Sequence, residues 1–174
     1  TLGEFENNEA GEALAAIAEK DGSDVFMAAA ILSSAIPHYD KLVRTANLSP
    51  QIIEGLLKMR ERFPKLAEEL SISILNSKSD ENKWRLLTHA SPSIQDRARN
   101  AALNVATDKD KPDLERVGAM ALLGKECVNQ LSSLLKSSSS IEIQTAVIDQ
   151  LSKVSSFEKI LESWPGFEPQ IKNS

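Results

Sequence analysis

Short breaks rich in Ser, Asp and Pro divide the chain into a succession of apolar-periodic segments, and this punctuation constrains the fold more than any other feature. The segments are roughly 9–16 residues long and repeat apolar side chains every three or four positions, as amphipathic helices do. No run alternates β-branched and polar residues, so strands are not predicted. We therefore predict an all-α fold of helices joined by tight turns.

Proline opens three of the expected helices. At the first helical position its missing N–H is no loss, because that donor would have no partner within the helix. A serine precedes two of these prolines, where its hydroxyl can accept from the first free backbone N–H groups. The residues are Pro37, Ser49-Pro50 and Ser91-Pro92.

Two further helix starts are predicted from capping boxes, Ser139 with Glu142 and Ser155 with Glu158. In each, the serine oxygen and the glutamate carboxylate can satisfy two backbone donors that the helix itself leaves free. The second box precedes an apolar face at helical spacing. That face consists of Phe157, Ile160, Leu161 and Trp164.

The C-terminal part contains two similar helical pairs. A shift of 28 positions aligns Arg116 with Gln144, Val117 with Thr145, Met120 with Ile148 and Leu123 with Leu151. Each pair has an apolar stripe that it cannot bury alone, so neighbouring pairs are expected to stack. We predict an α-solenoid of stacked helical hairpins, a HEAT/armadillo-like superhelix, although its period is shorter than the roughly 40–47 residues of HEAT units.

We expect residues 1–174 to form a single helical-repeat domain. The nearly all-apolar run at residues 25–35 predicts a buried inner helix. The polar break at residues 76–82 is the expected joint, where a change of direction is favoured over a domain boundary. Because Thr1 is not an initiator Met and no signal-peptide pattern follows it, we expect the chain to be a segment of a larger protein.

The formal net charge is −5, from 20 Lys and Arg against 25 Asp and Glu. Affinity for nucleic acid comes mainly from Lys and Arg on the phosphate backbone, so an acidic chain of this size is a poor candidate for nucleic-acid binding. No apolar stretch approaches the roughly 20 residues that a membrane-spanning helix needs, so direct membrane insertion is not expected. We expect a monomer whose partners are neighbouring domains of the same chain or another protein.

Few side chains suggest chemistry. His38 and His89 stand at expected helix ends, where a histidine is usually solvated or caps the helix rather than binding a metal. Cys127 is the one cysteine, which excludes an internal disulfide and a cysteine metal cluster, and we interpret it as structural. Ser33-Ser34 have no base nearby in the sequence, so we interpret them as small residues that let a neighbouring helix approach.

Charged and aromatic residues also favour structural roles. At helical spacing, the basic residues between positions 58 and 65 point in several directions, which is typical of a solvated face. These residues are Lys58, Arg60, Arg62 and Lys65. Glu68 and Glu69 are adjacent and so do not face each other on a helix, while Trp84 and Trp164 lie on apolar faces and are expected in the core. We predict no catalytic, cofactor-binding or metal-binding residue, no cofactor, and no identifiable binding residue.

Two stretches resemble a planctomycete family of large membrane-bound dehydrogenases that contain HEAT-like repeats. Residues 24–35 are similar to the family's D-x-aromatic-x-R-x-A-I-L-S-S helix. The later stretch is similar to its R-x-x-A-x-x-L-L-G … L-x-x-L-L … V-Q-x-A-A … L-L-x-x-W … P run. It comprises Glu115-Arg116-Val117, Leu122-Leu123-Gly124, residues 131–135, residues 142–147, residues 160–164 and Pro169. Residues 48–106 resemble the family only in their general pattern of apolar and polar residues.

The resemblance implies a parent protein with an N-terminal β-propeller of the sugar or sorbosone dehydrogenase type and a C-terminal c-type cytochrome domain. The helical repeats would lie between these domains and would be exported, periplasmic or membrane-associated with them. None of the family's redox residues is present in this chain, so no functional residue carries over. Ala28 stands where the family has Arg. An ion pair that the family makes through this Arg is therefore in doubt in this chain.

We therefore expect a non-catalytic helical-repeat scaffold or protein-interaction segment of such an exported dehydrogenase. One alternative is a free-standing cytoplasmic adaptor of the HEAT or armadillo kind that binds a protein partner. A remote alternative is a HEAT-like enzyme acting on nucleic acid, as the helical-repeat DNA glycosylases do. The charge of −5 and the unclustered aromatic residues argue against that enzyme.

Overall fold

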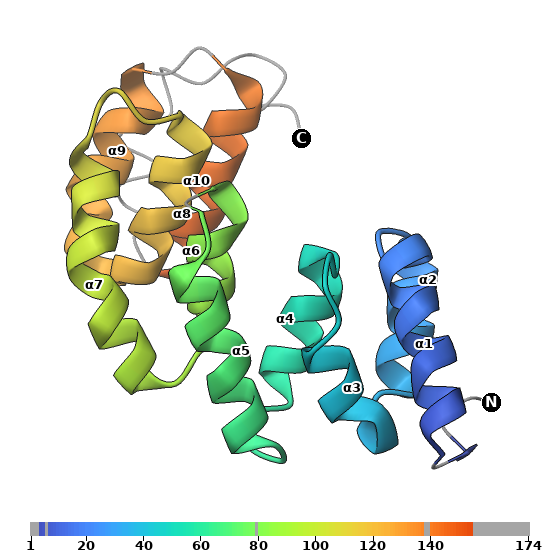
Figure 1. Cartoon of the computed structure of the whole chain (residues 1–174). Helices are drawn as coiled ribbons and strands as arrows, with labels where there is room; N and C mark the ends of the chain where they lie inside the picture. The colour runs from blue at the N-terminus through green and yellow to red at the C-terminus, as the bar shows by residue number, and fades with distance from the viewer. Residues whose placement is uncertain (1–3, 6, 79, 138–139, 155–174) are drawn as a thin grey trace. The chain divides into compact units, whose positions relative to one another are not determined.

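Every regular element in the described part of the chain is a helix (Figure 1), so the all-α prediction is confirmed there. The computed structural model describes residues 4–5, 7–78, 80–137 and 140–154. The capping box at Ser155 and the apolar face that includes Trp164 lie outside these residues.

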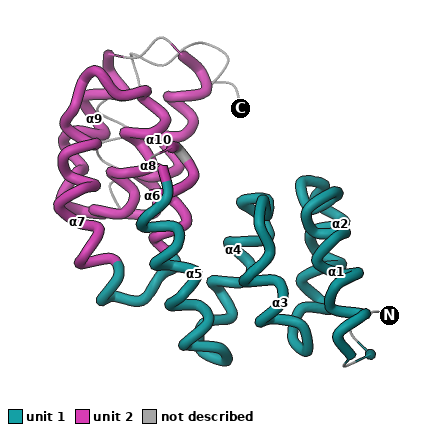
Figure 2. The backbone as a smooth tube through the Cα atoms, in the orientation of Figure 1, with its two compact units in different colours: residues 1–77, 89–94 teal, residues 78–88, 95–174 magenta. Residues whose placement is uncertain are grey.

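The chain forms two compact units (Figure 2). Unit 1 comprises Thr1–Ser77 and His89–Ile94, and unit 2 comprises Lys78–Thr88 and Gln95–Ser174. The first passage from one unit to the other falls at residues 77–78, inside the polar break at residues 76–82. The single-domain organisation stays a prediction.

Unit 1 contains five α-helices and a 3₁₀ helix within its described residues. They are α1 (Asn8–Asp21), α2 (Val25–Ser33), η2 (Ile36–His38), α3 (Tyr39–Val43), α4 (Pro50–Lys58) and α5 (Pro64–Asn76). α1 packs against α2 and α3, α2 also packs against α4, and α5 contacts α3 and α4. Alternate helices are therefore neighbours in space as well as consecutive ones.

Local hydrogen bonding accounts for the helix starts in unit 1. The Asp24 carboxylate accepts from Phe26 N and Met27 N at 3.0 and 2.9 Å and so caps α2. Pro50 begins α4 as predicted, whereas Pro37 is the second residue of η2, one position later than predicted. Ser49 is the N-cap of α4 and accepts from Ile52 N at 3.3 Å, which confirms its predicted role.

In the core of unit 1, the side chain of Tyr39 contacts two neighbouring segments. Tyr39 on α3 is almost fully buried, and its hydroxyl donates to Leu56 O on α4 at 2.8 Å. Its ring stacks on Phe63, just before α5, with centroids 4.2 Å apart. Burial raises the pKa of Tyr39 to about 12 because the phenolate loses its hydration. A single residue thus ties α3, α4 and the start of α5 together.

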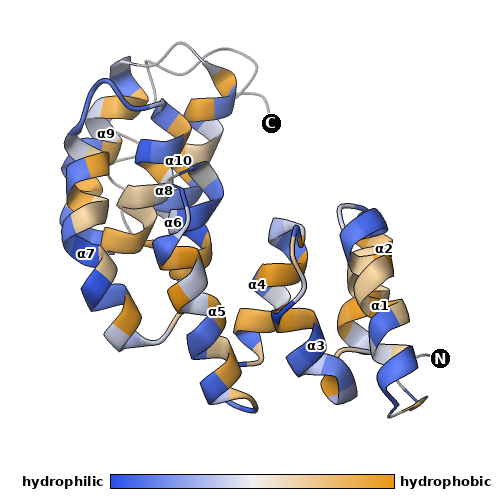
Figure 3. Ribbon diagram, in the orientation of Figure 1, coloured by the Kyte–Doolittle hydropathy of each residue, from blue (hydrophilic) through white to orange (hydrophobic). Residues whose placement is uncertain are grey.

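Helix α2 is not the buried inner helix that its composition predicts. Ala28 and Ile31 are buried, but Phe26 is 85% exposed and Val25 69% exposed. Most of α2 is coloured towards the hydrophobic end of the scale in Figure 3, and the exposed Val25 and Phe26 lie on it. The prediction was wrong because α1 and α4, the neighbours of α2 within unit 1, cover only one side of the helix. A nearly all-apolar sequence does not indicate which side of a helix its neighbours cover.

Unit 2 contains α6 (Glu81–Leu87), most of α7 (Pro92–Thr107), α8 (Asp113–Leu123), η3 (Gly124–Cys127), α9 (Val128–Ser137) and α10 (Ile141–Lys153). α6 packs along α8, α8 along α10, and α10 along α9. Gly124 ends α8 with φ at +63°, a conformation that favours glycine.

The 28-residue spacing of the two C-terminal pairs is present in the helices themselves, since α8 starts at residue 113 and α10 at residue 141. The aligned Leu123 and Leu151 are both buried. By contrast, Val117 is buried while its counterpart Thr145 is exposed. The spacing thus fixes where the helices lie but not the environment of every residue.

The N-cap of α10 is Ser140, whose Oγ accepts from Ile143 N at 3.4 Å. The capping-box prediction placed it one residue earlier, at Ser139, which lies outside the described residues. Consecutive serines make the choice of cap ambiguous in the sequence, because each carries the same acceptor.

Candidate functional site

A groove of about 550 Å³ lies within unit 2 on the surface formed by α6, α8 and α10. α8 forms its floor, and α6 and α10 form its two walls. Its lining comprises Asn82, Arg85, Leu114, Val117, Gly118, Ala121, Glu142, Thr145, Ala146, Asp149 and Gln150. The volume falls within the roughly 300–1,000 Å³ typical of ligand clefts.

The floor is a continuous helical stripe of α8. Leu114, Val117, Gly118 and Ala121 follow the i, i+3, i+4, i+7 pattern, so they share one face of the helix. Gly118 and Ala121 carry little or no side chain, which keeps this part of the floor low between the walls. Ala146 of α10 adds another small side chain beside them. The floor is therefore apolar along two helical turns, and small residues make up much of it.

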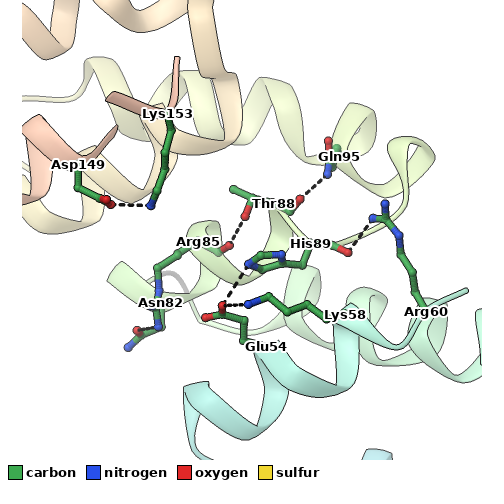
Figure 4. Close-up of polar contacts among 10 residues, drawn as sticks. All are labelled: Glu54, Lys58, Arg60, Asn82, Arg85, Thr88, His89, Gln95, Asp149 and Lys153. Atoms are coloured by element: carbon green, nitrogen blue, oxygen red, sulfur yellow. Dashed lines mark hydrogen bonds and ion pairs between the residues drawn. The ribbon is translucent and has the colours of Figure 1, made fainter. Parts of the chain in front are cut away.

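The two walls carry opposite charges. On α10, Glu142 and Asp149 are separated by seven residues and so lie on the same side of the helix. Asp149 Oδ2 forms an exposed ion pair with Lys153 Nζ at 2.5 Å. On α6, an Arg85 guanidinium nitrogen lies 3.4 Å from Asn82 Oδ1 (Figure 4). One wall thus presents carboxylates and the other a guanidinium and an amide.

Helix α6 is fixed by its cap and by its buried face. The Asp80 carboxylate accepts from Asn82 N and Lys83 N at 2.9 and 2.8 Å. Trp84 is 2% exposed and does not line the groove, so this tryptophan lies in the core as expected. Lys83 Nζ lies 5.2 Å from the centroid of the Trp84 ring. These contacts hold Asn82 and Arg85 at the groove surface.

Lys83 is a buried lysine between two carboxylates. Burial lowers the pKa of its ammonium group, and the nearby Asp80 and Glu115 oppose that shift. Glu115 on α8 is also buried and lies 3.7 Å from Lys111 Nζ. Because α6 and α8 form the most extensive helix contact of unit 2, this charged cluster helps to set the spacing between the floor and one wall.

The lining contains no histidine or cysteine, and within the described residues no group of three or more His, Cys, Asp or Glu side chains could hold a metal ion. Apolar contact with the floor and charge pairing with the walls are the interactions that this arrangement offers. The groove is thus suited to recognition of a ligand surface.

The two histidines have different environments in the structure. His38 was predicted to be solvated or capping: it is 4% exposed and so not solvated, and it occupies the N-cap position of α3 without a capping hydrogen bond from its side chain. A Cβ at Gly11 would lie 3.1 Å from His38 Nδ1, so the glycine permits close packing of α1 on η2. His89 is half-buried, and its Nε2 lies 3.6 Å from Glu54 Oε1 (Figure 4). Sequence reasoning missed this carboxylate because it belongs to a different helix, α4.

The basic residues between positions 58 and 65 do not form one patch. Lys58 pairs with Glu54 at 2.6 Å, and Arg62 lies over the Phe63 ring at 5.8 Å. Arg60 donates from the same guanidinium nitrogen to His89 O at 2.9 Å and Ala90 O at 2.6 Å. The interpretation as a solvated face is therefore incomplete, because Arg60 binds the main chain at the end of another segment of unit 1.

A smaller cavity of about 150 Å³ lies beside Arg60 and His89 in unit 1. Its lining includes Ser71, whose Oγ donates to Ala67 O on its own helix at 2.7 Å. Glu68 also lines this cavity, while its neighbour Glu69 is exposed on α5.

The remaining candidates occupy structural positions. Cys127 is 1% exposed, and burial, followed by the charge of Glu126, raises the pKa of its thiol. The exposed Ser33 donates to Ala30 O at 2.7 Å, whereas Ser34 is buried. None of these three residues lies in the groove.

None of the helices in the described part of the chain combines the length and apolar character needed to cross a membrane. No protein-family model, curated protein or solved structure that was compared with the chain matches it.

Proposed function

We propose that this chain is a non-catalytic helical-repeat segment that binds a protein partner through the groove of unit 2. The observation that carries the proposal is the composition of the groove, with an apolar floor between walls of opposite charge. Protein recognition sites combine an apolar centre with a polar rim in this way. The apolar part supplies affinity, and the charged rim selects the orientation of the partner.

The proposed architecture is an α-solenoid of stacked helical hairpins. It is supported by the 28-residue spacing of α8 and α10 and by the packing of α6, α8 and α10 in succession. In such a stack, each helix of one layer contacts the next helix of that layer, and the layer offers an extended binding surface. The groove lies on the surface of this row of three helices.

The partner would be either a neighbouring domain of the parent protein or a separate protein. In the first case, the segment would space a β-propeller from a cytochrome domain in an exported dehydrogenase, as the family resemblance suggests. The buried position of Ala28, where that family has Arg, does not favour this part of the resemblance. In the second case, the chain would be a free-standing adaptor. Determination of the complete coding sequence distinguishes the two.

Site-specific photo-crosslinking tests the proposal. A photo-reactive phenylalanine analogue replaces Thr145, which is exposed on the α10 wall of the groove, and in a matched variant it replaces Ser133, which is exposed on α9 outside the groove. In cells that naturally make the protein, we expect a defined protein segment to be crosslinked from position 145 and not from position 133. Equal crosslinking from both positions, or none from position 145, would contradict the proposal.

A further inference from the structure

The charged positions of the groove have the spacing of a helix. Glu142 and Asp149 lie seven residues apart on α10, which at 1.5 Å per residue is about 10 Å along the wall. The floor residues Leu114 and Ala121 are also seven residues apart on α8. The carboxylate wall and the apolar floor therefore extend over the same two helical turns.

A ligand helix matches this length better than an extended segment does. In about 10 Å an extended strand places roughly three residues, of which only one or two face the floor. A helix of the same length presents apolar side chains at i, i+3, i+4 and i+7, the pattern used by helices that bind in grooves. The stripe formed by Leu114, Val117, Gly118 and Ala121 repeats at the same interval.

The walls also determine which charges the ligand carries. The carboxylate of Glu142 attracts basic side chains along one edge of a bound helix, and at Asp149 a basic side chain of the ligand replaces the exposed Lys153 Nζ that lies at 2.5 Å. On the other side, the Arg85 guanidinium favours an acidic side chain. A helix with its basic and acidic edges exchanged can pair with both walls only when its chain direction is reversed, whereas a helix with mixed charges on each edge places like charges together on both walls.

We propose that the groove binds a two-turn amphipathic helix of a protein partner, with Lys or Arg along the edge facing α10 and Asp or Glu along the edge facing α6. This inference rests on the proposed function and deepens it by stating the chemistry of the partner. The exposed charges set orientation more than affinity, because solvent screens them. The apolar stripe of the ligand supplies the larger part of the binding free energy.

Two synthetic peptides test the inference against the full chain. Both are stabilised helices of equal length and composition with Leu at i, i+3, i+4 and i+7. The matched peptide carries Lys along one edge of its apolar stripe and Glu along the other, and the mixed peptide alternates Lys and Glu along both edges. By fluorescence polarisation at low salt, we expect the matched peptide to bind with a Kd of roughly 10–100 μM, at least about fivefold more tightly than the mixed one.

Charge reversal on α10 should remove this preference, because both walls are then basic. In the double variant Glu142→Lys with Asp149→Lys, both substitutions lie on exposed positions, and the two peptides should bind within about twofold of each other. The matched control is Glu68→Lys with Glu69→Lys, which makes the same change in net charge on α5 of unit 1 and should leave the preference unchanged. Ala121→Trp should fill the floor and weaken both peptides at least about tenfold. Circular dichroism establishes that each variant is folded.

Several results would overturn the inference. They are equal binding of the two peptides, an unchanged preference in the Glu142 and Asp149 double variant, or no binding of either peptide. Equal binding by a proline-containing peptide that cannot form the helix would assign the groove to an extended segment, and self-association of the chain would assign it to a second copy. If peptides fail but crosslinking from Thr145 succeeds, the proposed function stands and only the helix chemistry is wrong.

Discussion

The Ser49 hydroxyl donates to Gly22 O at 2.5 Å, and this bond joins the start of α4 to the end of α1. The same oxygen accepts from Ile52 N, so one side chain both caps a helix and binds another segment. Gly22 is required there, because a Cβ at this position would lie 2.3 Å from Ala18 O. Unit 1 thus depends on a polar contact between residues far apart in the sequence.

Substitution Ser49→Ala should lower the free energy of unfolding by about 1–2 kcal/mol, because the helix loses its cap and a buried carbonyl loses its donor. Urea denaturation followed by circular dichroism measures the change. Ser33→Ala is the control, since its exposed hydroxyl binds only the carbonyl of Ala30 on its own helix, and it should change stability by less than about 0.5 kcal/mol. Equal effects of the two substitutions would disprove the role of Ser49.

Tyr39 should ionise with a pKa of about 12 instead of its ordinary value near 10. Because the chain contains a single tyrosine, tyrosinate absorbance at alkaline pH reports this residue alone. The native protein should show little tyrosinate at pH 11, and the protein unfolded in urea should be mostly ionised. A native titration midpoint near 10 would contradict the burial of the hydroxyl.

The raised pKa of Tyr39 also predicts how stability depends on pH. The folded state holds the proton to higher pH than the unfolded state, so this contribution is complete below about pH 10 and is lost as pH rises towards 12. Between pH 9 and pH 11, the native chain should lose about 1 kcal/mol more than Tyr39→Phe does. Parallel loss in the two proteins, measured by urea denaturation at each pH, would refute the linkage.

The open face of α2 predicts unequal effects of two apolar substitutions. Phe26→Gln should change the free energy of unfolding by less than about 0.5 kcal/mol because the side chain is exposed. Ile31→Ala, on the buried side of the same helix, should cost about 2–4 kcal/mol. A large destabilisation by Phe26→Gln would show that this face is covered in the native protein.

Cys127 should react slowly with thiol reagents in the native state. Its side chain is almost fully buried, and burial raises the pKa of the thiol, so both access and the thiolate fraction are low. At pH 8, we expect labelling at least about tenfold slower than in urea. The chain has one cysteine, so the measured rate belongs to this residue; rapid native labelling would contradict its position.

The features predicted correctly from the sequence are those that local hydrogen bonding decides. Ser49 caps α4 because its oxygen meets donors two or three residues away, and Pro50 begins α4 for a similarly local reason. The spacing between α8 and α10 was visible because both helices repeat the same apolar intervals.

The features that were missed depend on packing between distant segments. The side of α2 that stays open is decided by α1 and α4, and His38 is buried because α1 reaches η2 at Gly11. The groove was not predicted because its two walls lie on α6 and α10, which are far apart in the sequence. Its floor also depends on small residues such as Gly118 and Ala121, which do not by themselves indicate a groove. The nearest signal in the sequence is the helical spacing of Leu114, Val117 and Ala121.

The ratio of crosslinking from position 145 to crosslinking from position 133 tests the central claim most directly. Both residues are exposed in unit 2, but only Thr145 lines the groove. Binding of a protein partner in the groove predicts a defined crosslinked segment from position 145 and none from position 133. Crosslinks of equal yield at both positions, or none at position 145, would contradict it.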